Sequence, residues 1–206
     1  MTSPAAYNLA PLAGILAIGL LLAAAPVWWA ARQHRRGSAV TWRHALCLVT
    51  LFLTFDLVVF GAFTRLTDSG LGCPDWPGCY GSTSPVGASA PIAQAQSALP
   101  DGPVTVQKAW IEMIHRFLAT GVGALILLLA IAAWKDARQS AASAWLATGT
   151  LLWVCLQGAF GALTVTMKLF PAIVTLHLLG GMVLLALLVV QVAQTMRVAP
   201  GSHGGP

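Results

Sequence analysis

Residues 114–134 read IHRFLATGVGALILLLAIAAW, and Arg116 is the one charged side chain in this stretch. A helix of about 20 mostly apolar residues is long enough to cross the hydrocarbon core of a membrane. Transmembrane strands would instead appear as shorter segments that alternate between apolar and polar residues. Four further stretches have the same apolar character, at residues 10–31, 45–64, 144–165 and 172–193. The sequence therefore predicts an all-α integral membrane protein with five spanning helices.

The composition of the chain excludes several classes of protein. Of its 206 residues, 57% are hydrophobic and 8% are charged, whereas roughly a quarter of the residues in a soluble domain are charged. This contrast excludes an ordinary soluble enzyme, a disordered chain and a nucleic-acid binder. The net charge of +5 is better explained by membrane topology than by a basic binding face.

The positions of the basic residues predict the orientation of the spans, because cytoplasmic loops carry an excess of Lys and Arg. An outside N-terminus and an inside C-terminus place most of the 11 basic residues in the cytoplasm, namely Arg32, Arg35, Arg36, Arg43, Lys135, Arg138 and Arg197. The residues left outside are Arg65, Lys108, Arg116 and Lys168. We therefore expect this orientation, in the cell inner membrane, where the outer loop meets an oxidising compartment.

The spans divide the chain into three parts. Residues 1–43 hold the extra N-terminal helix and a basic cytoplasmic loop, residues 44–197 form a four-helix transmembrane bundle, and residues 198–206 form a disordered tail. The bundle contains an external loop at residues 65–113. Because residues 81–103 of this loop are rich in Gly, Pro, Ser and Ala without a periodic pattern, we expect them to be irregular or mobile.

A short sequence echo links the second and fourth spans. The sequence FGAFT at residues 60–64 ends the second span, and FGALT at residues 160–164 ends the fourth. Each is followed by an external loop and by a span that begins near a histidine. The echo indicates two related helix pairs that face each other, but short matches between apolar segments also arise from composition alone.

Two histidines lie within spans that enter from the outer side. His115 follows Trp110 by five residues and His177 follows Pro171 by six, which places both about 8–9 Å along their helices. Two imidazoles at one depth are suited to ligating a haem iron from both faces. Small residues one or two turns below them leave room for a flat porphyrin or for close helix packing, namely Ala119, Gly123, Gly180 and Gly181. Hydrogen-bonded packing is the alternative role for each histidine.

Three charged residues lie near the same outer surface. Glu112 is three residues before His115, on the same helical face. Its carboxylate is either a proton-transfer group for a bound substrate or an exposed charge near a helix N-terminus. Arg65 and Arg116 either pair with haem propionates, which guanidinium groups bind in a bidentate manner, or extend to the interface as long cations.

The external loop contains Cys73 and Cys79, and the second span contains Asp56. In an oxidising compartment the two cysteines form either a structural disulfide or a redox-active pair, and their spacing does not separate these roles. A mid-span carboxyl is expensive in a membrane. Asp56 is therefore either part of a proton path or a buried, neutral, hydrogen-bonded acid.

Four segments of the chain resemble signature sequences of the heme A synthase family. They are GAFTRLTDSGL at residues 61–71, EMIHR at 112–116, QGAFGALTV at 157–165 and His177-Leu178. Their order and their placement in the membrane also match, and the resemblance covers about residues 45–195. The combination of loop and histidine segments is fairly specific, whereas the apolar segments are not.

The resemblance implies a membrane oxidoreductase that converts haem O to haem A, by successive hydroxylations of a ring methyl to a formyl group, to supply cytochrome oxidase. It implies a haem b cofactor, iron ligation by His115 and His177, and participation of Glu112 in the oxidation. The external cysteine pair of some members corresponds to Cys73 and Cys79. Haem O synthase and cytochrome oxidase assembly factors are the implied functional partners.

The chain departs from the common form of that family, which is a tandem of two four-helix halves with two histidine pairs. It resembles the first half, preceded by an extra span at residues 10–31. One histidine pair holds one haem, so we expect a homodimer, a second half-size subunit or an inactive chain; a two-fold dimer would recreate the tandem. Two other functions stay open: a quinone-linked membrane thiol oxidase that uses Cys73 and Cys79, and a non-catalytic haem-binding or assembly protein.

Overall fold

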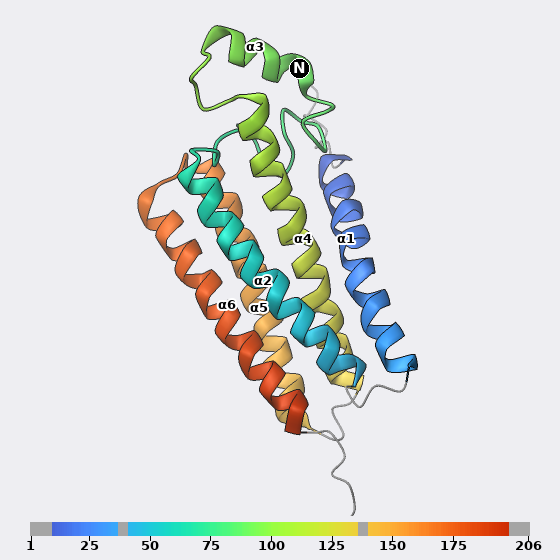
Figure 1. Ribbon diagram of the computed structural model, residues 1–206. Coiled ribbons are helices and arrows are strands. Elements are labelled where there is room, and N and C mark those ends of the chain that lie inside the picture. The colour runs from blue at the N-terminus through green and yellow to red at the C-terminus, as the bar shows by residue number, and fades with distance from the viewer. Residues whose placement is uncertain (1–9, 37–40, 136–139, 198–206) are drawn as a thin grey trace, which may run out of the picture.

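In a computed structural model of the chain, residues 10–36, 41–135 and 140–197 are described (Figure 1). Six helices form in these residues: α1 (Ala10–Arg35), α2 (Trp42–Leu66), α3 (Ser89–Ala98), α4 (Val106–Lys135), α5 (Ala141–Thr166) and α6 (Pro171–Arg197). All of them except α3 are long and apolar enough to cross a membrane. The predicted all-α membrane fold with five spans is confirmed. The predicted disordered tail lies outside the described residues.

The helices begin at residues that cap them rather than where the apolar runs begin. The side chain of Thr41 accepts a hydrogen bond from the backbone N–H of His44 at 3.2 Å at the start of α2. Thr105 does the same for Lys108 at 3.2 Å at the start of α4. Such caps satisfy backbone donors that the first helical turn leaves free. As a result α4 starts about two turns before the predicted span, and Glu112 lies inside the helix.

Four of the helices form a closed bundle. Helix α2 packs against α4 and α6, and α5 packs against the same two helices, so that α4 and α6 lie diagonally opposite each other in the described part of the chain (Figure 1). Helix α1 packs outside this bundle, against α4 and α2. The arrangement confirms a four-helix bundle with one additional N-terminal helix.

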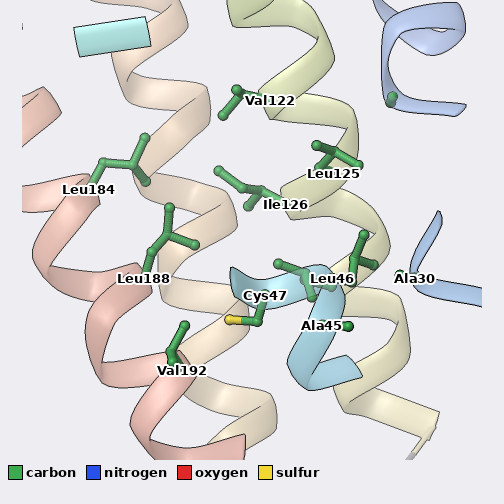
Figure 2. Packing of buried hydrophobic residues seen from close by; sticks show 12 residues of the cluster. Ala30, Ala45, Leu46, Cys47, Val122, Leu125, Ile126, Leu184, Leu188 and Val192 are labelled. Carbon is green, nitrogen blue, oxygen red and sulfur yellow. The ribbon is translucent and has the colours of Figure 1, made fainter. Parts of the chain in front are cut away.

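The bundle is held together by apolar side chains at the end away from the external loop. Leu46 of α2, Leu125 and Ile126 of α4, and Leu188 of α6 are almost fully buried there and point into the space between the helices (Figure 2). In a membrane such contacts stabilise the bundle through close packing rather than through the exclusion of water. This core fixes the positions of α4 and α6, which carry the two histidines.

The external loop is more ordered than the sequence indicates. Residues 81–103 were expected to be irregular or mobile, and the structure corrects this, because α3 forms within them. Ile92 of α3 is 1% exposed and packs in a second apolar cluster with Cys73, Cys79 and Met113. Only one residue of α3 is buried. A helix of this kind has no stripe of apolar residues on one face, so the sequence gives no periodic signal for it. Its docking through Ile92 holds it against the outer end of α4.

The sequence echo corresponds to a structural repeat at the outer ends of α2 and α5. The backbone N–H of Ser69 donates to the carbonyl of Thr64 at 2.9 Å, and that of Leu169 donates to the carbonyl of Thr164 at 2.7 Å. Asp68 and Lys168 precede these donors with φ of 52° and 51°. The two helices therefore end in the same left-handed C-terminal turn, offset by 100 residues. This repeat pairs α2 and α4 with α5 and α6.

Candidate functional site

The two intramembrane histidines come from the diagonal helices of the bundle. His115 lies on α4 and His177 on α6, and each is partly buried. The Nδ1 atom of His177 is buried and has no hydrogen-bond partner among the described residues. The two imidazoles therefore lie on diagonally opposite helices, at the same end of the bundle as the two C-terminal turns of the repeat.

Each imidazole lies against a glycine of the structural repeat. A Cβ atom built on Gly61 of α2 would lie 3.0 Å from Nε2 of His115. A Cβ atom built on Gly161 of α5 would lie 3.5 Å from Cε1 and 3.8 Å from Nε2 of His177. The ring of Phe60 is nearly parallel to that of His115, with centroids 6.3 Å apart. Both histidines thus occupy equivalent places in the repeat.

Gln157 of α5 is a further polar residue beside this region. It is 7% exposed, and its Oε1 atom has no hydrogen-bond partner among the described residues. Its amide lies against Gly180, where a Cβ atom would fall 2.0 Å from Nε2 of Gln157. The sequence favours a helix–helix hydrogen bond for Gln157, which is the default role of a polar residue in a span, whereas its Oε1 atom makes none with the described residues.

The carboxylate of Glu112 lies at the outer boundary of the site and is buried. Glu112 is 4% exposed, so it is not an exposed charge. Its Oε2 atom accepts a hydrogen bond from the backbone N–H of Cys73 at 2.7 Å, and its Oε1 atom forms an ion pair with Arg116. Glu112 therefore connects the external cysteine loop to the helix that carries His115.

Arg116 organises the same loop. One of its nitrogens, Nη1, donates to the carbonyls of Asp75 at 3.0 Å, Pro77 at 3.1 Å and Gly78 at 2.5 Å, while Nη2 contacts Glu112. A planar guanidinium with several donors is suited to such convergent contacts. The predicted propionate contact of Arg116 stays a prediction, and these contacts already engage the guanidinium.

Arg65 has a different environment. It is exposed at the outer end of α2, and its side chain forms no hydrogen bond or ion pair with the other described residues. Nearby, Nζ of Lys108 pairs with Asp68 at 3.2 Å and also donates to the carbonyl of Gly102 at 3.1 Å. Of the two predicted propionate ligands, Arg116 is therefore already bonded to the loop and to Glu112, whereas the guanidinium of Arg65 has no partner among the described residues.

The predicted disulfide is confirmed. Cys73 and Cys79 are joined, with Cα atoms 4.9 Å apart, and both are 0% exposed. Asp75, inside the resulting ring, accepts backbone hydrogen bonds from Tyr80 at 2.6 Å and from Gly81 at 2.7 Å. The loop is therefore held by the disulfide, by Asp75 and by Arg116 together.

Replacing Cys73 and Cys79 by Ser is expected to lower the free energy of unfolding by about 2 kcal/mol, the value for closing a loop this short. Guanidinium or thermal unfolding of the purified protein in detergent measures this change. The matched control is Cys47→Ser, which alters a free cysteine in the apolar core. Equal stability of the double variant and the original protein would show that Asp75 and Arg116 suffice to hold the loop.

Together these features define a multi-pass membrane protein with one histidine on each of two diagonal helices and a buried carboxylate hydrogen-bonded to a disulfide-closed loop. Residues 44–204 match the COX15-CtaA family, described as cytochrome oxidase assembly protein. The chain belongs to this family. Membership confirms the resemblance seen in the sequence and, with the five spanning helices, the localisation as a multi-pass protein of the cell inner membrane.

Curated proteins that are similar in sequence to this chain include heme A synthases. The chain is 43% identical over 158 residues to a heme A synthase of Shewanella oneidensis, covering 76% of this chain and 46% of the relative. It is 29% identical to a heme A synthase of Rhizorhabdus wittichii, covering 86% and 55%. A protoheme IX farnesyltransferase of Natronomonas pharaonis is 30% identical over 78% of this chain and 30% of its own length. The chain thus spans about half the length of the heme A synthases it matches. No solved structure matches it.

Proposed function

We propose that this chain is a membrane oxidoreductase of haem A biosynthesis, which oxidises a ring methyl of haem O to a formyl group by successive hydroxylations. The observation that carries the proposal is the pair of imidazoles on diagonal helices, each against an equivalent glycine, in a member of this family. Converting a methyl group and water to a formyl group releases four electrons and four protons. A bound haem b would supply electron transfer for this oxidation, and an electron acceptor in the membrane would take up the four electrons.

The residues present fit a haem. The donor set of His115 and His177 consists of imidazoles, which are common axial ligands of haem iron. The unpartnered Nδ1 of His177 and the missing Cβ atoms at Gly61 and Gly161 are the local features that support this fit. We assign iron ligation to His115 and His177, and a propionate contact to Arg65, whose side chain is exposed at the outer end of the site.

Glu112 is the proposed proton-transfer residue. It lies one helical turn from His115 on the same face, so it borders the region between the imidazoles. Its two oxygens accept hydrogen bonds from Arg116 and from Cys73, which fix the orientation of the carboxylate. A group held in this way needs little reorganisation when a proton is transferred.

Haem O synthase is the proposed supplier of the substrate, because haem O carries a farnesyl chain that a farnesyltransferase must add. The similarity to part of a chain named protoheme IX farnesyltransferase supports this link between the two reactions. Cytochrome oxidase assembly factors are the proposed recipients, which the family description supports. We retain the orientation with the external loop outside, where an oxidising compartment favours the disulfide.

The test is to express the chain in cells that supply haem O and to identify the haem by mass. We expect haem A in the presence of the original chain, and a loss of haem A of at least about a hundred-fold with Glu112→Gln, as for removal of a proton-transfer group. The matched control is Gln107→Glu, which alters an amide on the same helix outside the site. Haem bound without any haem A would identify a non-catalytic haem protein instead.

We also infer that α2 packs against a second copy of the chain. Asp56 lies near the middle of this spanning helix and is exposed, without a hydrogen-bond or ion-pair partner among the described residues. Because a carboxyl in lipid is costly, a second bundle on this face would stabilise it. Phe52, Phe55 and Val59 are exposed on the same part of α2. A second copy would also supply the second histidine pair that a substrate and a cofactor haem together need.

Cross-linking through α2 tests this inference. In a Cys155→Ser background, which removes the exposed free cysteine, Phe52→Cys is expected to form a covalent dimer in native membranes. Leu20→Cys on α1 is the matched control, because Phe52 is 65% and Leu20 61% exposed, and it is expected to stay monomeric. Cross-linking of Phe52→Cys to a different protein would identify a second half-size subunit, and equal cross-linking of both variants would contradict an interface at α2.

A further inference from the structure

Among the glycines of the described spanning helices, the two of the structural repeat are the ones whose added Cβ would meet a histidine ring. Gly19 and Gly180 also have close neighbours, but these are Thr120 and Gln157. Gly61 and Gly161 each lie beside a histidine ring, at 3.0 Å and at 3.5 Å from the nearest imidazole atom to an added Cβ. An added Cβ on Gly123, Gly149 or Gly158 would meet nothing within 4 Å. These three positions therefore tolerate a methyl group, whereas the glycines of the repeat have a specific neighbour.

In both halves of the bundle the residue next to the glycine is the histidine that we propose as an iron ligand. The residues Gly61 and Gly161 occupy the same place before the same left-handed C-terminal turn, offset by 100 residues. Each faces a histidine on the next spanning helix in the chain, α4 for Gly61 and α6 for Gly161. Two separate segments of the chain thus place a glycine opposite an imidazole. This favours a common structural role for the two glycines over a chance match between apolar segments.

The two contacts differ in tightness. A Cβ on Gly61 would approach the Nε2 atom of His115, which is the nitrogen at the tip of the ring, at a distance that side chains rarely adopt. A Cβ on Gly161 would make an ordinary van der Waals contact with the edge of the His177 ring. A methyl group at position 61 therefore occupies space that an iron-ligating nitrogen needs, while one at position 161 only touches the ring.

We propose that Gly61 and Gly161 are paired positioning residues that keep the space beside the two imidazoles clear for a metal-bearing planar macrocycle, and that Gly61 is the stricter of the two. The proposal rests on the proposed function for the identity of the macrocycle. The clearance itself is a property of the polypeptide. It explains why the FGA segment recurs in α2 and α5, at the level of the histidines.

The first experiment compares absorption spectra of the purified full chain, expressed with haem available. Gly61→Ala is expected to lose the low-spin haem signal about ten-fold or more, as overpacking of a tight contact implies, and Gly161→Ala is expected to lose less than Gly61→Ala. Gly158→Ala, in open space on the same helix as Gly161, is expected to keep the signal. An unchanged spectrum for Gly61→Ala, or an equal loss for Gly158→Ala, overturns the proposal.

A double-mutant cycle without haem tests the clearance separately. Gly61→Ala is expected to lower the thermal midpoint of the apoprotein by about 2–4 °C or more. In a His115→Ala background the same change is expected to leave the midpoint unchanged or higher, because the ring is gone and Ala favours helix over Gly. An equal decrease in both backgrounds overturns the proposal. If the original chain binds no haem, the proposed function fails, and this cycle still decides whether Gly61 acts through His115.

Discussion

Replacing His115 or His177 by Ala is expected to abolish the low-spin haem spectrum of the purified protein. In the proposed function both imidazoles would hold the haem iron, so the loss of either would remove one of its two nitrogen ligands and with it the low-spin state. Mutations of residues that merely orient a metal ligand cost about 10–100-fold in affinity, so removal of the ligand itself should exceed this range. Absorption and electron paramagnetic resonance spectra of the two variants measure the change.

The matched control for the two histidine variants is His44→Ala. His44 lies at the other end of the bundle, where its Nδ1 atom is 2.8 Å from Oγ1 of Thr195, away from the predicted ligands. This variant should retain the spectrum, because it removes a histidine without removing an axial ligand. A low-spin spectrum that survives unchanged in both His115→Ala and His177→Ala would refute the assignment of the ligands.

The parts of this structure that depend on long apolar runs follow from the sequence. A spanning helix must satisfy its own backbone hydrogen bonds in lipid, so five apolar stretches predict five helices. The predicted depth of His115 along its helix used Trp110 as the helix start, whereas α4 begins four residues earlier at Val106; the start used for His177, Pro171, is the first residue of α6. Apolar runs did not predict two helical segments. One is α3, which is held by the single buried residue Ile92. The other is the first two turns of α4, because Thr105 caps a helix that begins before the apolar run.

The candidate site shows a second limit of sequence reasoning. The proximity of Cys73 and Cys79 in the chain made a disulfide readily predictable, and the structure confirms it. The partners of Arg116 were not predictable, because the backbone carbonyls that it contacts depend on how residues 75–78 fold. A charged residue near a membrane surface has several stable environments, and only the tertiary contacts of the loop select one of them.

Arg116 is the residue whose removal should destabilise the external loop most, because it bonds three backbone carbonyls of the loop and the carboxylate of Glu112. Arg116→Met leaves the 4% exposed Glu112 without its cation and three carbonyls without their donor. Breaking a buried ion pair by removing one partner costs about 3–5 kcal/mol. We expect a decrease of this size in the free energy of unfolding, together with faster proteolysis of the loop. Arg116→Lys should recover little, because a single ammonium cannot reproduce the planar guanidinium contacts.

Two further variants separate the ion pair from a general loss of positive charge. Arg65→Met removes an exposed arginine at the same membrane surface and should change stability by less than about 0.5 kcal/mol. Glu112→Leu combined with Arg116→Met removes both charges and should be more stable than Arg116→Met alone, since no buried carboxylate then lacks a partner. If Arg116→Met and Arg65→Met have equal free energies of unfolding, the stability of the loop does not depend on the guanidinium of Arg116. The contacts of Glu112 with Cys73 and Arg116 would then not stabilise the attachment of the loop to α4.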